Sequence, residues 1–69
     1  MARLREASAL MRQGRADEAV EIFAALARAN PRQPELQNNL GVALKAAGRP
    51  KEAVQAYRRA LKLAPDYVV

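Results

Sequence analysis

The sequence contains no cysteine, no histidine and no tryptophan. Without cysteine there is no disulfide framework, no thiolate zinc site and no cysteine nucleophile. Without histidine the chain lacks the commonest general base and metal ligand. Ser8 is its only serine or threonine, so a serine triad cannot be assembled. We therefore expect no catalytic residues, no cofactor and no metal site, and we predict that the chain is not an enzyme.

Long apolar runs and aromatic residues are also scarce. The longest uninterrupted apolar stretch runs from Ile22 to Ala27, which is far too short to cross a membrane. No charged-then-apolar signal segment opens the chain, so we expect no membrane contact and a cytoplasmic location. Only Phe23, Tyr57 and Tyr67 are aromatic. A core built from alanine, leucine and valine suits closely packed helices better than sheets.

Positive charge is in excess. Twelve basic and seven acidic residues give a net charge of +5, which favours solubility and acidic partners. Nucleic acid is a disfavoured partner, because the basic residues lack the interleaved aromatic platforms that single strands require and no RNA-binding signature is present. Alanine is abundant and arginine outnumbers lysine, which indicates a GC-rich coding sequence and, we expect, a bacterial source.

An internal repeat determines the expected fold. Shifting the sequence by 34 residues aligns Ala9 with Ala43, Leu10 with Leu44, Gly14 with Gly48, Arg15 with Arg49, Glu18 with Glu52, Ala19 with Ala53, Val20 with Val54, and Pro31 with Pro65. Apolar residues recur at helical spacing, glycine ends the first helix of each unit, and proline follows the second. The pattern predicts an all-α fold of two tandem helix-turn-helix repeats, residues 1–33 and 34–67, with 68–69 opening a third unit or forming a tail. The four antiparallel helices are expected at about 2–13, 15–29, 35–47 and 50–63.

The repeat resembles the tetratricopeptide repeat, whose pattern is W-x2-L-G-x2-Y, then A-x3-F, then P. The second unit reads Gln37-x2-Leu40-Gly41-x2-Leu44, then Ala53-x3-Tyr57, then Pro65. It departs from the pattern at Gln37, where tryptophan is usual. The second helix of the first unit matches through Ala19, Phe23 and Pro31, while its first helix diverges with Arg3 and Glu6.

Small residues are expected where the two helices of each hairpin cross. Ala7 and Gly41 lie on the first helices, and Ala19 and Ala53 lie on the facing second helices. Small side chains let helix axes approach to the low end of the usual spacing. We therefore predict that Gly41→Leu overpacks its crossing.

The resemblance implies a non-catalytic protein–protein interaction scaffold that binds a partner peptide in a concave groove lined by the first helices. The implied groove residues are Leu4, Ser8, Met11, Arg12, Asn38, Asn39, Val42 and Lys45. Asn39 is the sharpest candidate, because an amide both donates and accepts and can bond a peptide backbone at two points. Arg12 and Lys45 favour an acidic peptide. The alternative is that all these residues are ordinary solvated side chains.

The two ends of the chain differ in character. Arg3 and Glu6 suit a first repeat with no repeat before it. Tyr67, Val68 and Val69 are apolar and would open a third unit of a longer array, or else fold back onto the last hairpin. We expect homo-oligomerisation through this open end, involving Ala56, Tyr57, Leu63, Tyr67, Val68 and Val69. The alternative function is an N-terminal repeat segment of a larger enzyme, such as a glycosyltransferase, that recruits substrates.

Overall fold

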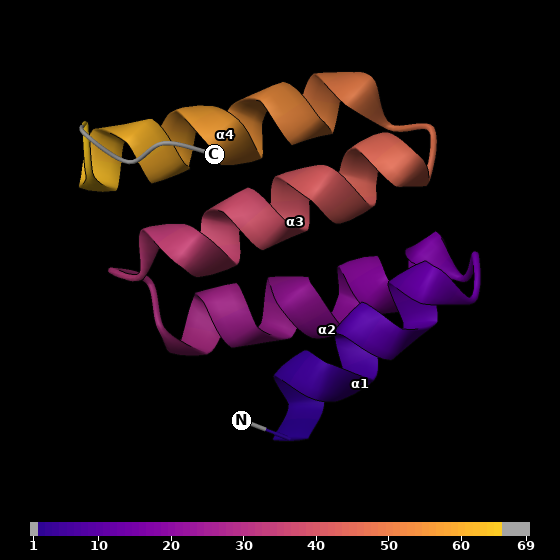
Figure 1. Ribbon diagram of the computed structural model, residues 1–69. Coiled ribbons are helices and arrows are strands. Elements are labelled where there is room, and N and C mark those ends of the chain that lie inside the picture. The colour runs from indigo at the N-terminus through magenta and orange to yellow at the C-terminus, as the bar shows by residue number, and fades with distance from the viewer. Residues whose placement is uncertain (1, 66–69) are drawn as a thin grey trace.

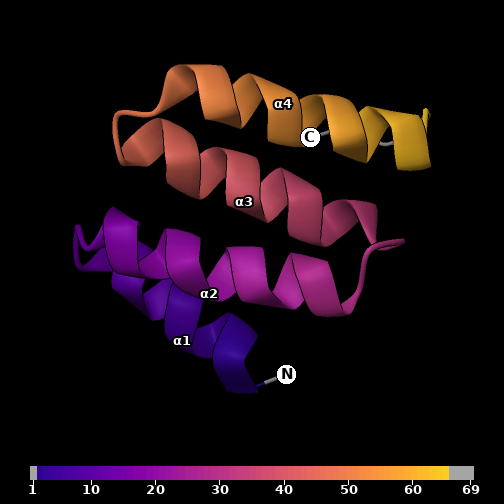
Figure 2. The same ribbon diagram turned by 180° about the vertical axis from the view of Figure 1, so that it is seen from behind.

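The computed structural model describes residues 2–65, which form four α-helices. Their bounds are α1 (Ala2–Arg12), α2 (Ala16–Ala29), α3 (Pro34–Ala46) and α4 (Pro50–Leu63). Each helix packs against the next, and α3 lies between α2 and α4 in views from both sides (Figures 1 and 2). The predicted all-α architecture of two helix-turn-helix repeats is confirmed, and each helix ends within one residue of the expected position.

The turns inside the two repeats have the same geometry. Gly14 and Gly48 have φ angles of 76° and 77°, a left-handed conformation that glycine adopts without a steric penalty. The backbone N–H of the next residue then donates to the carbonyl five residues back, Arg15 to Leu10 and Arg49 to Leu44, each at 2.8 Å. Glycine therefore closes the last turn of α1 and of α3 and directs the chain into the following helix.

An arginine and a glutamate form a forked ion pair at the start of both second helices. Arg15 donates from Nε and Nη2 to the two carboxylate oxygens of Glu18, both at 2.8 Å. Arg49 does the same to Glu52 at 3.0 and 2.7 Å. The carboxylate is also favoured there by the helix dipole. Both pairs are solvent-exposed, so they add little to stability and instead mark the repeated geometry.

The core is built largely from alanine and leucine, with Phe23 as the one buried aromatic side chain among the described residues. Ala7, Ala19, Ala43 and Ala56 are each 0% exposed. The expected close approach at Gly41 is present, because a Cβ built there would lie 2.7 Å from Cε1 and 2.8 Å from Cδ1 of Tyr57. The Tyr57 ring thus lies directly against the α3 backbone.

Replacing Gly41 with leucine tests this contact. We expect Gly41→Leu to lower the free energy of unfolding by about 1–3 kcal/mol, since the new side chain must displace the Tyr57 ring. Urea denaturation followed by circular dichroism measures the change. Ala46→Leu is the matched control, because Ala46 is exposed on the same helix and its replacement should change stability little. An unchanged urea midpoint for Gly41→Leu would show that the crossing is not tight.

The ion pair at the start of α4 predicts a titration shift. The hydrogen bond from Arg49 holds the pKa of Glu52 below its ordinary value, against an opposing effect of desolvation. A lowered folded-state pKa means that the contribution of the pair is present above the unfolded pKa and is lost as pH falls through the folded pKa. Carboxyl-carbon NMR should show a lower midpoint for Glu52 in the folded chain than in urea. Arg49→Ala should abolish most of that difference, and equal midpoints in the wild-type chain would contradict the prediction.

Candidate peptide-binding groove

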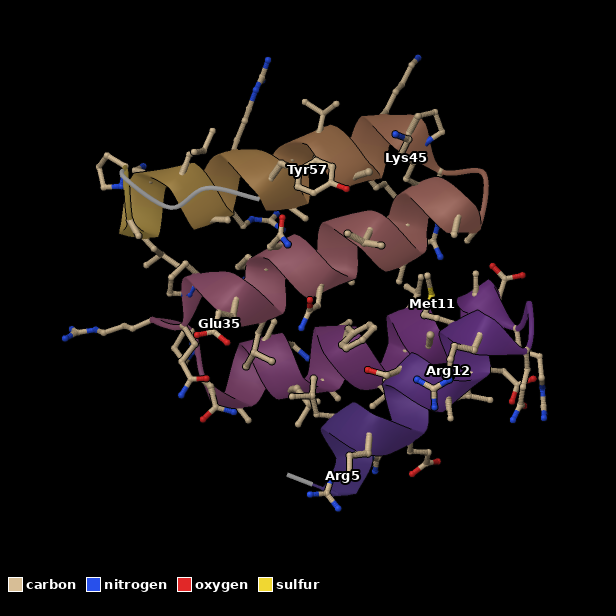
Figure 3. The ribbon with its side chains drawn as sticks, viewed as in Figure 1. Arg5, Met11, Arg12, Glu35, Lys45 and Tyr57 are labelled. Carbon is tan, nitrogen blue, oxygen red and sulfur yellow. The ribbon has the colours of Figure 1, made fainter. Side chains whose placement is uncertain are left out.

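One face of α3 carries a row of four residues, three of which are exposed to solvent. Glu35, Asn38, Val42 and Lys45 are separated by three, four and three residues, so they share a helix face. Glu35 and Lys45 are exposed and Val42 is 42% exposed. Figure 3 shows Glu35 at the beginning of α3 and Lys45 near its other end. Glu35 was absent from the expected groove residues, although its spacing from Asn38 places it there.

Helix α1 carries the other expected groove residues, and it packs against α2. Leu4 and Met11 are half-buried and pack against the core, and Ser8 is also half-buried. Arg12 is exposed and lies with Met11 at the end of α1, at the same end of the bundle as Lys45 (Figure 3). Arg5, exposed and equivalent to Asn39 by the repeat shift, is a further polar residue of this helix that the expected groove set omitted.

The two asparagines of α3 have different surroundings. Asn38 is only 8% exposed, and its Oδ1 has no hydrogen-bond partner among the described residues. Asn39 is half-buried. A buried amide oxygen normally has a donor, from protein or from ordered water. Asn38 is therefore a more enclosed group than a groove-lining residue was expected to be, and it holds an acceptor that a donor could satisfy.

The expected self-association residues that the structure describes differ in exposure. Ala56 is 0% exposed, so its expected exposure is wrong: its methyl group fills the interface that α4 makes with the rest of the bundle. Tyr57 is half-buried over Gly41, and Leu63 is 40% exposed. Tyr67, Val68 and Val69 lie outside the described residues.

The repeat itself identifies the apolar surface that α4 exposes. Val20, Phe23 and Ala27 on α2 are 6%, 4% and 4% exposed, because α3 packs against α2. Their equivalents on α4 form what we term the α4 stripe: Val54 (47% exposed), the half-buried Tyr57, and Leu61 (48% exposed). Val54 and Leu61 were not among the expected self-association residues, yet the 34-residue shift alone would have found them.

The described residues hold neither a metal cluster nor a membrane span. Across residues 2–65, no group of three or more carboxylate, histidine or cysteine side chains is placed to hold a metal ion. None of the four helices has the length and apolar character that crossing a membrane requires.

Comparison with known proteins agrees with the architecture. Residues 4–68 match the family described as Tetratricopeptide repeat. The chain is 40% identical over 52 residues, 75% of its length, to the peroxisomal targeting signal receptor of Saccharomyces cerevisiae. It has the same identity and coverage with the receptor of that name from Candida glabrata. It spans only 8% and 9% of those proteins. On the match to residues 4–68, the chain belongs to the tetratricopeptide repeat family, whose repeats are protein–protein interaction modules.

Proposed function

We propose that the chain is a non-catalytic module that binds an acidic partner peptide along the face formed by α1 and α3. The order of charge along that face carries the proposal. Glu35 lies at the beginning of α3, whereas Lys45 near the end of α3 and Arg12 at the end of α1 both lie toward the other end of the bundle (Figure 3). Peptide carboxylates would be attracted to the Arg12 and Lys45 end, and Glu35 would repel them, so the peptide has a preferred direction.

The middle of the face offers contacts for the rest of a peptide. Val42 and Met11 present apolar surface, and the flexible thioether of methionine adapts to varied side chains. The half-buried Asn39 amide can both donate to and accept from a peptide backbone. The two relatives are peroxisomal targeting signal receptors, which is in keeping with peptide recognition. Nothing among residues 2–65 favours the alternative of a segment that serves a larger enzyme.

Charge reversal on α3 tests the proposal. Peptides are selected from a random peptide library on the wild-type chain, and their affinities are measured by fluorescence anisotropy. We expect the selected peptides to be acidic and Lys45→Glu to weaken their binding about tenfold, because it removes an attractive charge and adds a repulsive one.

Lys51→Glu is the control for this experiment. Lys51 is exposed at the start of α4, outside the proposed face, so its reversal changes the net charge equally. Its effect should stay within about twofold, the size expected of general electrostatic steering. Equal losses in the two variants, or selected peptides without acidic residues, would overturn the proposed site.

We further propose that the α4 stripe mediates self-association with the same stripe of a second copy. The difference in exposure between the stripe and its α2 equivalents supports this, because the same residue positions are covered when a helix packs on them. The exposed Val54 and Leu61 and the half-buried Tyr57 leave apolar surface in water, which favours burial. The occupant proposed here is a second α4.

Sedimentation equilibrium across a concentration series checks the self-association. We expect the wild-type chain to form a concentration-dependent dimer and Leu61→Glu to be monomeric throughout, since a charge would be buried in the interface. Gln55→Glu adds the same charge on an exposed part of α4 away from the stripe and should leave the dimer intact. A wild-type monomer at every concentration would contradict the proposal.

A further inference from the structure

A hollow crosses α3 on the side away from the proposed peptide face. Its volume is about 640 Å³, and its lining comes from α2, the following loop, α3 and α4: Ala24, Ala27, Arg28, Pro31, Gln37, Leu40 and Arg59. A second hollow of about 270 Å³ adjoins it, sharing Pro31, Gln37 and Arg59 and adding Lys62 and Leu63. We call the two together the Gln37 groove. None of its lining residues belongs to the peptide face.

Rotation along α3 separates the two surfaces. Each residue of a helix turns the side chain by about 100°. This places Gln37 and Leu40 on the side of α3 away from Val42. A ligand in the Gln37 groove would therefore leave the residues of the peptide face untouched.

Gln37 explains why this groove is open. It occupies the position at which the repeat pattern has tryptophan, and a glutamine side chain fills much less space than an indole ring. Its Oε1 is buried and has no hydrogen-bond partner among the described residues. The substitution thus leaves both volume and an unused acceptor at the floor of the groove. The terminal amide rotates on a broad torsion, so Oε1 can turn toward a ligand.

The groove is basic on its rim and apolar on its floor. Arg28, Arg59 and Lys62 line it, and no carboxylate does. Arginine binds a carboxylate through two parallel hydrogen bonds, which also fixes the direction of approach. Leu40 and the two alanines of α2 supply apolar surface beside these cations. The lining therefore suits a ligand with carboxylates and an apolar side chain.

We propose that the Gln37 groove is a second binding site, which takes an acidic peptide segment with an apolar side chain next to its carboxylates. The carboxylates pair with Arg28 and Arg59, the apolar side chain lies over Leu40, and a backbone N–H of the segment donates to Gln37 Oε1. The Gln37 Oε1 acceptor favours a peptide over phosphate. A peptide backbone supplies an N–H donor to Oε1, whereas phosphate at neutral pH offers mainly oxygen acceptors.

NMR titration of the full chain with a short peptide of alternating glutamate and leucine tests the site. We expect shifts in the Gln37 side-chain amide and in the Nε–H signals of Arg28 and Arg59, while the Asn39 side-chain amide stays unchanged. Fluorescence anisotropy with the labelled peptide gives the affinity. Arg59→Glu should weaken binding about tenfold, because one of the two guanidinium partners is lost and replaced by a like charge.

Two further variants make the test specific. Arg58→Glu is the matched control, since Arg58 is exposed beside Arg59 on α4 but does not line the groove, and binding should change less than about twofold. Gln37→Trp should fill the hollow and abolish binding. Circular dichroism checks that its helices are intact. If the tryptophan variant fails to fold, Gln37→Leu takes its place. This variant removes only the amide and should weaken binding.

The outcomes separate this site from the peptide face. Loss of binding in Arg59→Glu and Gln37→Trp but not in Lys45→Glu supports a second site. The reverse pattern overturns the second site and leaves the peptide face standing. Equal losses in Arg58→Glu and Arg59→Glu, displacement of the peptide by inorganic phosphate at equal concentration, or no shift at Gln37 each also overturns it.

Discussion

The contact between Gly41 and the Tyr57 ring sets the geometry on which both proposed surfaces depend. A Cβ at residue 41 would approach the ring to 2.7 Å, so a larger residue at this position must displace Tyr57. The close approach fixes how α3 and α4 cross. It thereby orients the two sides of α3, with Val42 and Lys45 on one side and Gln37 and Leu40 on the other. The same contact holds Tyr57 half-buried at the edge of the α4 stripe.

Both surfaces follow from helices that pack in sequence. Because α3 lies between α2 and α4 (Figures 1 and 2), its side chains can reach a surface on either flank. One flank joins α1 to form the proposed peptide face. The other joins α2 and α4 to form the Gln37 groove. A chain of this size has little interior, so a binding function must use these flanks of α3. The flanks differ from those of an ordinary hairpin where residues depart from the repeat pattern.

Glutamine at residue 37 leaves open a space that tryptophan would fill, and the proposed second binding site uses this space. An indole at this position would fill the space between α2 and α4, whereas the amide leaves a hollow of about 640 Å³ and a buried oxygen without a partner. Such an oxygen is costly in an otherwise apolar setting. Arg28 and Arg59 approach the hollow from different helices and are 31 positions apart in the sequence. The groove therefore exists only because repeats stack, and no single hairpin contains it.

The sequence by itself determined the repeat, the four helices and the two glycine turns, because local spacing of apolar residues, glycine and proline governs helix bounds. It also indicated Gly41 as a crossing point. Exposure was decided by tertiary structure alone. Ala56 and Val54 look equally apolar in sequence, yet one is 0% and the other 47% exposed, since the direction in which each faces depends on how α4 rotates against α3. The burial of Asn38 and the basic rim around Gln37 likewise required neighbours from other helices, which no local pattern specifies.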